Sequence, residues 1–308
     1  MNEHRQAPTS LLAPKSLADT LPPHVWFCVS ALFHYLGPAF AVLLFSQVGV
    51  LGMAWLRIAT AALVFAPLTR PWRVLAGADW RTRRLLLVFG ACLAIMNCSF
   101  YLALARLPIS TVATIEFVGT IGVALWGARS SRNLAALAIA VVGTLMLVDM
   151  SWSNDPRGLF WAFLNGALFV GYIILGHRVA ASGAGGGIAG LGAAMTVAFL
   201  VVLPLGLGEA LPAFSSPSLL LAAVGVGICS SVIPYICDQL AMARLPRASF
   251  ALMLSLLPVV ATLIGALVLG QIPSPRDCLG IALVVAGVAI HRPALPVAQR
   301  LEPKPTSP

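Results

Sequence analysis

The chain has 308 residues, of which 59% are hydrophobic and only 9% are charged, and its formal net charge is +9. Soluble domains carry about 25% charged residues, so this composition excludes a soluble globular protein and predicts an integral membrane protein. The basic residues lie in short loops between apolar runs, which is typical of membrane topology and excludes a nucleic-acid-binding surface.

Apolar runs follow one another along almost the whole chain. A membrane-spanning helix needs about 17–25 mostly apolar residues, and its backbone polar groups must be satisfied within the segment, so these runs predict α-helices. The predicted fold class is an all-α polytopic membrane protein. Its ten predicted spans are residues 25–45, 49–68, 85–105, 109–127, 134–150, 159–176, 188–207, 219–242, 248–269 and 278–291.

The polar segments divide the chain into two halves of five spans each. Residues 1–23 lack the apolar region of a removed signal peptide and are expected to form a cytoplasmic N-terminal segment. Residues 24–150 and 158–291 form the two halves, joined by an external linker at 151–157. Residues 292–308 are rich in proline and are expected to form a disordered cytoplasmic tail.

The distribution of basic residues predicts the orientation. With the N-terminus in the cytoplasm, only Arg106, Arg157 and Arg276 of the 19 Lys and Arg residues lie outside, and Arg57 lies within a span. Cytoplasmic loops carry the excess of Lys and Arg in membrane proteins. The sequence therefore predicts that both termini are cytoplasmic.

One hexapeptide occurs twice. ALARLP at residues 103–108 returns as AMARLP at residues 241–246, which is 138 residues later. Five spans separate the copies, so they face opposite sides of the membrane, which indicates an inverted-topology repeat of the kind that transporters use for alternating access. The fifth and tenth spans are also alike in their small residues. The alternative is a chance similarity in a chain rich in alanine and leucine.

Three ionisable residues lie within spans, where each costs about 2.5–3.5 kcal/mol and is a functional candidate. They are Arg57 in the second span, Glu116 in the fourth and Asp238 in the eighth. Arg57 and Glu116 each follow an external loop by about eight residues, so both lie about 12 Å deep. Two interpretations stay open: a static ion pair, or a site in which Glu116 binds a proton or a substrate ammonium group while Arg57 faces a carboxylate or restrains Glu116.

Asp238 shares a helix face with Ser231, Pro234 and Tyr235. Pro234 removes a backbone hydrogen bond and can open a carbonyl toward a cavity. Because Asp238 lies near the cytoplasmic end of its span, it is either a snorkelling carboxylate or a proton or amine site.

Uncharged polar residues complete the candidate site. Asn97 and Tyr235 are equivalent under the 138-residue offset, so both are expected to face a shared cavity. Thr120 follows Glu116 on its face with Gly119, and both are small enough for a close neighbour or a water-lined cavity. Ser255 is a further candidate, with a helix–helix hydrogen bond as the alternative role. The same alternative is favoured for three other polar residues, His34, Asn165 and Thr262.

Motifs of soluble enzymes do not occur in the sequence. It contains no H-E-x-x-H, no metal-spaced group of cysteines and histidines, and no phosphate-binding loop. We therefore expect no metal, no cofactor and no catalytic activity. Energy for transport would come from an ion gradient or from the gradient of the substrate.

Three stretches, residues 56–73, 96–125 and 230–270, resemble the EamA branch of the drug/metabolite transporter superfamily. The resemblance includes E-F-x-G at Glu116 and a pattern in the eighth span that begins at Pro234-Tyr235 and ends in Arg-Leu-Pro. Three positions depart from the family: Thr120 replaces a proline, Leu257 replaces a glutamate before Pro258, and Gln271 replaces a glutamate. These departures bear on the substrate rather than on the fold.

The resemblance implies ten transmembrane helices in two inverted five-helix repeats around a cavity, in the bacterial inner membrane, with a homodimer as a further expectation. It also implies secondary export of amino acids such as threonine or homoserine, or of related small metabolites, in exchange for protons. Efflux of lipophilic cations or drugs is the alternative. An intramembrane enzyme or a passive channel is less favoured.

Overall fold

The computed structural model describes residues 21–127, 130–147, 155–181 and 187–290, and every regular element among them is a helix. This confirms the all-α prediction for the described part of the chain. The expected disordered tail, most of the N-terminal segment and residues 151–154 of the expected linker lie outside the described residues.

Seven helices of the described chain are long and apolar enough to cross a membrane. Two of the seven are interrupted: one contains the π-helical turn η2 (Ile228–Val232), and the other breaks between α12 and α13. The seven spans are α2 (Pro23–Val48), α3 (Val50–Thr69), α5 (Trp80–Leu104), α8 (Pro156–Ala181), α9 (Gly187–Phe214), α10 and α11 (Pro217–Gly227 and Ile233–Met242), and α12 and α13 (Arg247–Met253 and Leu256–Leu269).

Three further helices occupy the fourth, fifth and tenth predicted spans. They are α6 (Ile109–Gly127), α7 (Ser131–Met146) and α14 (Pro275–Ile290). A short helix that the sequence did not predict, α4 (Pro71–Gly77), lies between α3 and α5. Seven of the ten predicted spans therefore meet the length and composition of a membrane helix, and the crossing of the other three stays a prediction.

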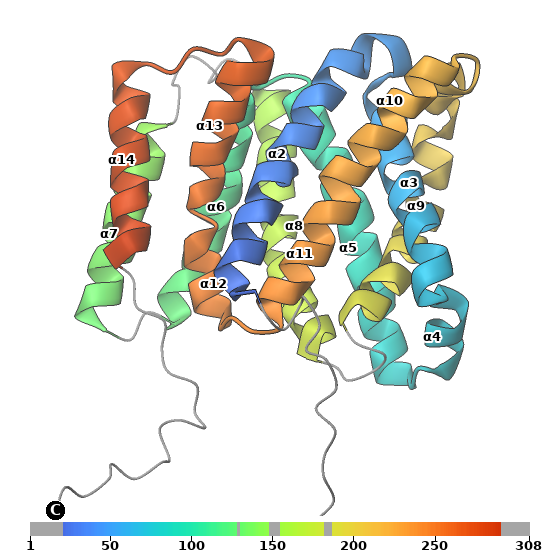
Figure 1. Cartoon of the computed structure of the whole chain (residues 1–308), viewed down its shortest axis with the longest axis horizontal. Helices are drawn as coiled ribbons and strands as arrows, with labels where there is room; N and C mark the ends of the chain where they lie inside the picture. The colour runs from blue at the N-terminus through green and yellow to red at the C-terminus, as the bar shows by residue number, and fades with distance from the viewer. Residues whose placement is uncertain (1–20, 128–129, 148–154, 182–186, 291–308) are drawn as a thin grey trace, which may run out of the picture.

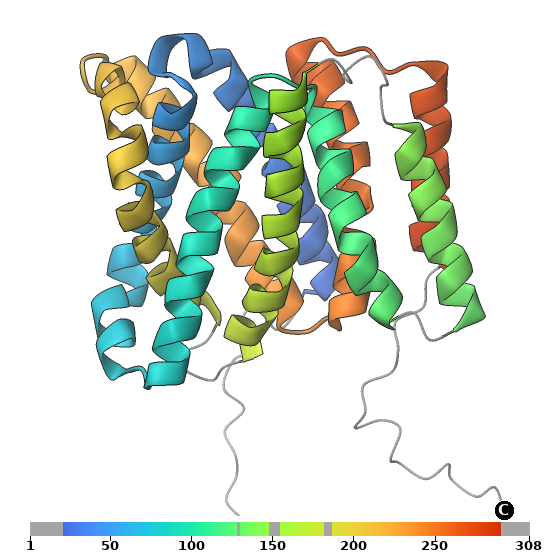
Figure 2. The ribbon, with the colours of Figure 1, turned by 180° about the vertical axis from the view of Figure 1, so that it is seen from behind.

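The long helices lie side by side and successive ones run in opposite directions (Figures 1 and 2). Helix α2 begins and α14 ends at the same end of the bundle, drawn at the bottom of Figure 1 and here called the lower end. The α5–α6 connection lies at the opposite, upper end, whereas the α11–α12 connection lies at the lower end. Helix α4 also lies at the lower end, beside α3 and α9.

Proline and short polar side chains set where the helices begin. Helices α2, α4, α8, α10 and α14 each start at a proline, whose missing N–H costs nothing in the first turn and whose φ suits the helix. Ser130 and Asp79 cap α7 and α5 by accepting hydrogen bonds from Asn133 N and Thr82 N, each at 3.2 Å.

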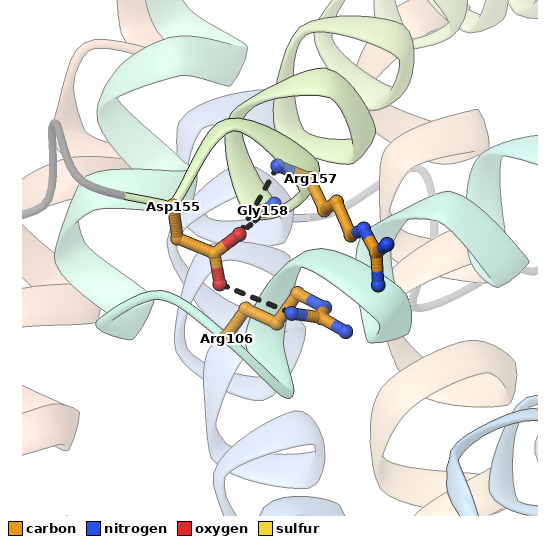
Figure 3. Close-up of polar contacts among 4 residues, drawn as sticks. All are labelled: Arg106, Asp155, Arg157 and Gly158. Atoms are coloured by element: carbon orange, nitrogen blue, oxygen red, sulfur yellow. Dashed lines mark hydrogen bonds and ion pairs between the residues drawn. The ribbon is translucent and has the colours of Figure 1, made fainter.

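Asp155 fixes the upper end of α8 to the α5–α6 connection (Figure 3). Its Oδ1 accepts hydrogen bonds from the backbone N–H groups of Arg157 at 3.1 Å and Gly158 at 2.9 Å, and its Oδ2 pairs with Arg106 Nη1 at 3.2 Å. The hydrogen bond from Gly158 contributes most to lowering the pKa of this carboxyl below its ordinary value, and Arg106 lowers it further. Two arginines and one acid thus meet at a helix start outside the apolar core.

Glycines allow two close approaches at the centre of the bundle. A Cβ on Gly119 of α6 would lie 3.0 Å from the carbonyl oxygen of Gly166 on α8, so these helices pack almost backbone to backbone. This confirms the expected close neighbour beside Glu116. A Cβ on Gly37 of α2 would lie 2.6 Å from Ser230 Cβ and 2.7 Å from Ser230 N, which is closer than a packed structure allows.

We predict that Gly37→Ala destabilises the protein by about 1–3 kcal/mol, because the new methyl group overpacks the contact between α2 and η2. Gly208→Ala on α9 is the matched control, since no atom lies within 4 Å of its added Cβ. Thermal unfolding in detergent measures both variants. Equal melting temperatures for Gly37→Ala and the wild type would contradict the close packing.

Candidate functional site

Glu116 lies at the centre of the bundle with 2% of its surface exposed. Tyr35 on α2 donates its hydroxyl proton to Glu116 Oε2 at 2.5 Å, and Asn165 Nδ2 on α8 donates to Oε1 at 2.7 Å. Each carboxylate oxygen therefore has one donor. The close approach of Gly119 and Gly166 brings α8 near enough for the short Asn165 side chain to reach Glu116.

Asp238 is also buried, with 4% of its surface exposed. Ser30 on α2 donates to its Oδ1 at 2.5 Å, and Tyr172 on α8 donates to its Oδ2 at 2.6 Å. The interpretation of Asp238 as a snorkelling carboxylate is therefore wrong. The side chain turns into the bundle, where two hydroxyl groups replace the water that a snorkelling group would reach.

The two carboxylates share the same two supporting helices. Helix α2 contributes Ser30 and Tyr35, helix α8 contributes Asn165 and Tyr172, and each helix donates one hydrogen bond to each acid. We call these four donors and two acids the double clamp. Asn165 and Tyr172 are seven residues apart on one helix face, so the two acids lie at depths that differ by about 10 Å.

Arg57 on α3 is 2% exposed and lies against the same interior. Its Nε donates to Ser231 Oγ and its Nη2 to the Ser230 carbonyl, both at 2.7 Å. Its guanidinium carbon lies 5.9 Å from the ring centre of Phe100 and 5.2 Å from that of Tyr101, within the range of cation–π attraction. Its Nη1 is buried and makes no hydrogen bond to the described residues.

Arg57 and Glu116 do not form the static ion pair that was one of the two interpretations of the sequence. Among the residues that the structure describes, the only carboxylate within 4.0 Å of a basic group is that of Asp155, beside Arg106. Ser231 lies two helical turns above Asp238, about the same distance as separates Glu116 from Asp238. Arg57 donates to Ser231, so it is close to the depth of Glu116, as the sequence predicts. Equal depth did not bring the two charges into contact, because each is directed to partners on other helices.

The partner of Arg57 follows from Pro234. Proline has no N–H, so the carbonyl four residues earlier, that of Ser230, loses its α-helical donor. Arg57 Nη2 supplies the missing hydrogen bond. The chain there forms the π-helical turn η2, a rare distortion that is frequent at functional sites. This is the carbonyl that the sequence predicts Pro234 to open.

Asn97 and Tyr235 contact each other. Asn97 Nδ2 donates to Tyr235 Oη at 3.0 Å, and the two side chains are also within hydrogen-bond reach in the reverse sense, at 3.3 Å to Asn97 Oδ1. Tyr235 lies next to Tyr172, with ring centres 5.7 Å apart. These residues therefore connect α5 and α11 to the double clamp.

Two other candidate residues lie apart from these contacts. Thr120 is fully buried and donates its hydroxyl to the Phe117 carbonyl of its own helix at 2.8 Å. Ser255 is fully buried at the break between α12 and α13, and its hydroxyl makes no hydrogen bond to the described residues. The structure therefore brings six of the eight candidate residues into polar contacts at the centre and leaves these two without a contact to them.

Three residues of the double clamp were missed by the sequence analysis, and Asn165 was considered only as a helix–helix contact. The missed residues are Ser30, Tyr35 and Tyr172. A tyrosine or serine in an apolar run has no pattern of its own, but Tyr35 and Tyr172 are 137 residues apart, close to the offset of the repeated hexapeptide. That spacing is the signal that could have found them.

The buried side chains at the centre offer binding sites for charged groups. Within the described chain, no group of three or more His, Cys, Asp or Glu side chains could hold a metal ion. Two buried acids and one buried guanidinium with an unpartnered N–H can instead bind groups of opposite charge. Neutralising a buried charge by a bound ion or a proton recovers the free energy that its desolvation costs.

Comparison with known proteins gives related sequences along most of the chain. The sequence profile of the EamA-like transporter family matches residues 156–291. The threonine/homoserine exporter RhtA of Escherichia coli (strain K12) is 30% identical over 253 residues, which are 81% of this chain and 84% of that protein. The exporter of the same name from Salmonella typhimurium (strain LT2) is 30% identical over 254 residues, with the same coverage.

A solved crystal structure superposes on the chain with a TM-score of 0.61 at 18% identity. The match covers 86% of this chain and 96% of the other. At this identity the likeness concerns the fold alone.

We predict that Tyr172→Phe lowers stability by about 1–3 kcal/mol, because it leaves one oxygen of the buried Asp238 carboxylate without its donor. Thr111→Val is the matched control: its hydroxyl is equally buried and makes no hydrogen bond to the described residues. Thermal unfolding in detergent at neutral pH compares them. If Thr111→Val lowers the melting temperature as much as Tyr172→Phe, the clamp at Asp238 contributes nothing.

Proposed function

The chain belongs to the EamA-like transporter family, and we propose that it exports small zwitterionic amino acids, such as threonine or homoserine, in exchange for protons. One observation carries this proposal. The buried acid Glu116 and the buried guanidinium of Arg57 lie at a similar depth in the bundle but do not contact each other. The relatives are named as exporters of these amino acids, and we propose that this chain exports them from the cytoplasm across the bacterial inner membrane.

The proposed topology is ten transmembrane helices in two inverted halves. Support comes from the helices that the 138-residue offset makes equivalent: α3 packs on α9, α6 on α12 and α13, and α7 on α14. Asn97 and Tyr235, which the offset also makes equivalent, contact each other, as expected of residues near a pseudo-twofold axis. The connections that carry the repeated hexapeptide lie at opposite ends of the bundle (Figure 1).

The lower end is proposed to be cytoplasmic. Helix α4 and the start of α5 lie there and carry Arg73, Arg81, Arg83 and Arg84, and Arg70 directly precedes α4. Such an excess of arginine is typical of the cytoplasmic side. Both ends of the described chain, at the start of α2 and the end of α14, also lie at this end, so the termini would be cytoplasmic.

The two charges of an amino acid fit the two unlike sites. The unpartnered Nη1 of Arg57 would donate to the substrate carboxylate, and Arg pairs with carboxylates more strongly than a neutral donor does. Glu116 would accept from the ammonium group, with Tyr35 and Asn165 holding its oxygens in place. A substrate that bridges Glu116 and Arg57 would supply the contact that these two side chains do not make themselves.

Coupling to protons would follow from competition for Glu116. A proton and a substrate ammonium group each neutralise the carboxylate, so they exclude each other and one can be exchanged for the other across the membrane. The double clamp would extend this competition to Asp238, since a shift of α2 or α8 at one acid also moves a donor of the other. We propose that Asp238 is the second proton site.

Efflux of lipophilic cations is the alternative function. A buried acid among aromatic rings suits such substrates, but the buried guanidinium of Arg57 at the same depth repels them. Counterflow of labelled threonine, compared with efflux of ethidium, separates the two. Counterflow also separates a carrier from a channel or an intramembrane enzyme, because neither of those performs it.

We predict that Glu116→Gln abolishes threonine counterflow and pH-driven transport in proteoliposomes, because the amide neither exchanges a proton nor pairs with an ammonium group. Glu209→Gln is the control, since Glu209 is exposed and caps the start of α3 by accepting from Leu51 N at 2.9 Å. Both variants should insert and unfold as the wild type does. Full transport by Glu116→Gln would refute the role of this acid.

For Arg57, the prediction concerns recognition of the carboxylate. Arg57→Ala should raise the apparent KM for threonine by roughly 30-fold or more, because a buried charged hydrogen bond is worth about 2 kcal/mol or more. Inhibition by 1-aminopropan-2-ol, which is threonine without its carboxylate, should not weaken. Arg57→Lys, which keeps the charge, should lie between. An unchanged KM in a folded Arg57→Ala protein would exclude this contact.

A further inference from the structure

An apolar groove of about 380 Å³ runs along the outside of the bundle between α3, α4 and α9. Its lining includes Trp55, Ala59, Ala62 and Ala66 on α3, Trp72 on α4 and Phe199 on α9. The lining combines small alanines on α3 with an aromatic ring from each of the three helices. None of the residues that hydrogen-bond to Glu116 or Asp238 lines the groove, and the proposed transport cycle does not use it.

The groove has the length of one lipid tail. From Trp55 to Ala66 helix α3 rises about 16 Å at roughly 1.5 Å per residue. One leaflet of a bilayer has a hydrocarbon depth of about 15 Å, half of the full core. At the α4 end the side chains of Trp72 and Trp80 are 60% and 71% exposed, as is typical of tryptophans at the membrane–water interface.

Basic side chains gather at this same end of the groove. Arg70, Arg73, Arg81 and Arg84 are exposed on α4 and on the segments beside it. Arg83 instead folds back, and its guanidinium donates to the carbonyls of Leu75 at 3.1 Å and Ala78 at 3.3 Å. This contact holds the start of α5 against α4, so the exposed arginines of both segments lie at the end of the bundle where Trp72 lines the groove.

We propose that this groove is a binding site for a phospholipid with an anionic headgroup. One acyl chain lies along α3 between the aromatic rings, and the arginines at the α4 end face the phosphate and headgroup. Neither feature alone selects this ligand: the groove would accept any lipid tail, and the arginines any anion. Because the groove and the arginines adjoin at the depth of the membrane–water interface, together they favour a lipid that has both an acyl chain and an anionic headgroup.

A second apolar groove offers an internal comparison. It lies between α2 and α10, has a volume of about 340 Å³ and is lined by residues that include Leu43, Leu44, Ala222 and Val226. Neither groove has a basic residue in its lining, but the segments beside the first one carry exposed arginines, whereas the connection before α10, at residues 215–216, carries none. This groove should accept lipid tails without preference for a headgroup.

The test is native mass spectrometry of the purified full-length protein in detergent. It is titrated with phosphatidylglycerol or phosphatidylcholine of identical acyl chains, and with glycerol 3-phosphate as a soluble headgroup. We expect tight binding of phosphatidylglycerol only. The triple variant Arg73→Gln, Arg81→Gln, Arg84→Gln should weaken this binding roughly 100-fold, at about fivefold for each arginine. The pair Arg157→Gln, Arg276→Gln removes two positive charges at the upper end; it is the control for loss of charge away from the groove and should bind as the wild type does.

A second pair of variants tests the tail. Ala66→Phe fills the proposed groove and should weaken the binding of phosphatidylglycerol to the level of phosphatidylcholine, whereas Ala222→Phe in the other groove should leave the preference for phosphatidylglycerol unchanged. Melting temperatures in lipid-free detergent show that each variant is folded. Equal affinity for the two lipids, or undiminished binding by the triple variant, would overturn the proposal. Competition by glycerol 3-phosphate at lipid concentrations would indicate an anion site instead, and a lipid-free dimer that Ala66→Phe dissociates would indicate a second copy of the chain.

Discussion

Two carboxylates buried in an apolar bundle constrain the helices around them. A charge without partners in such surroundings is too costly to keep, so each acid must be met by donors from neighbouring helices. Here the donors of both acids come from the same two helices, α2 and α8. The close approach of Gly119 to Gly166, and of Gly37 to Ser230, follows from this requirement, because short side chains such as Asn165 and Ser30 reach their acids only when the backbones nearly touch.

Arg57 is the third buried charge at the centre of the bundle, and it makes no ion pair with Glu116. Its partners are a serine hydroxyl, a carbonyl freed by Pro234 and two aromatic faces, none of which carries a negative charge. A buried cation supported only by neutral groups can still bind an anion. In the proposed function, the carboxylate of a zwitterion would bind Arg57 and its ammonium group would bind Glu116, which a pair of side chains that only holds two helices together would not allow.

The sequence predicted the spans, the three buried charges and the contact face of the eighth helix, because hydropathy and helical spacing are local properties. It gave Arg57 and Glu116 a similar depth but left open whether the two charges pair. Depth follows from residue count, whereas lateral position depends on how helices pack. The roles of Ser30, Tyr35 and Tyr172 could not be read from the sequence for the same reason. Helix α4 was missed because seven residues between two spans give too short a pattern. The proposal of an inverted repeat depends on the repeated hexapeptide and on the packing of helices that the 138-residue offset makes equivalent.

The central claim is that Glu116 and Asp238 act as one unit through α2 and α8. The most direct measurement is a double-mutant cycle on threonine affinity, by calorimetry, with Tyr35→Phe, Tyr172→Phe and the variant that combines them. Each tyrosine touches a different acid, so independent sites give additive effects within about 0.3 kcal/mol. The account predicts an interaction energy of about 0.5 kcal/mol or more, and additivity would contradict it.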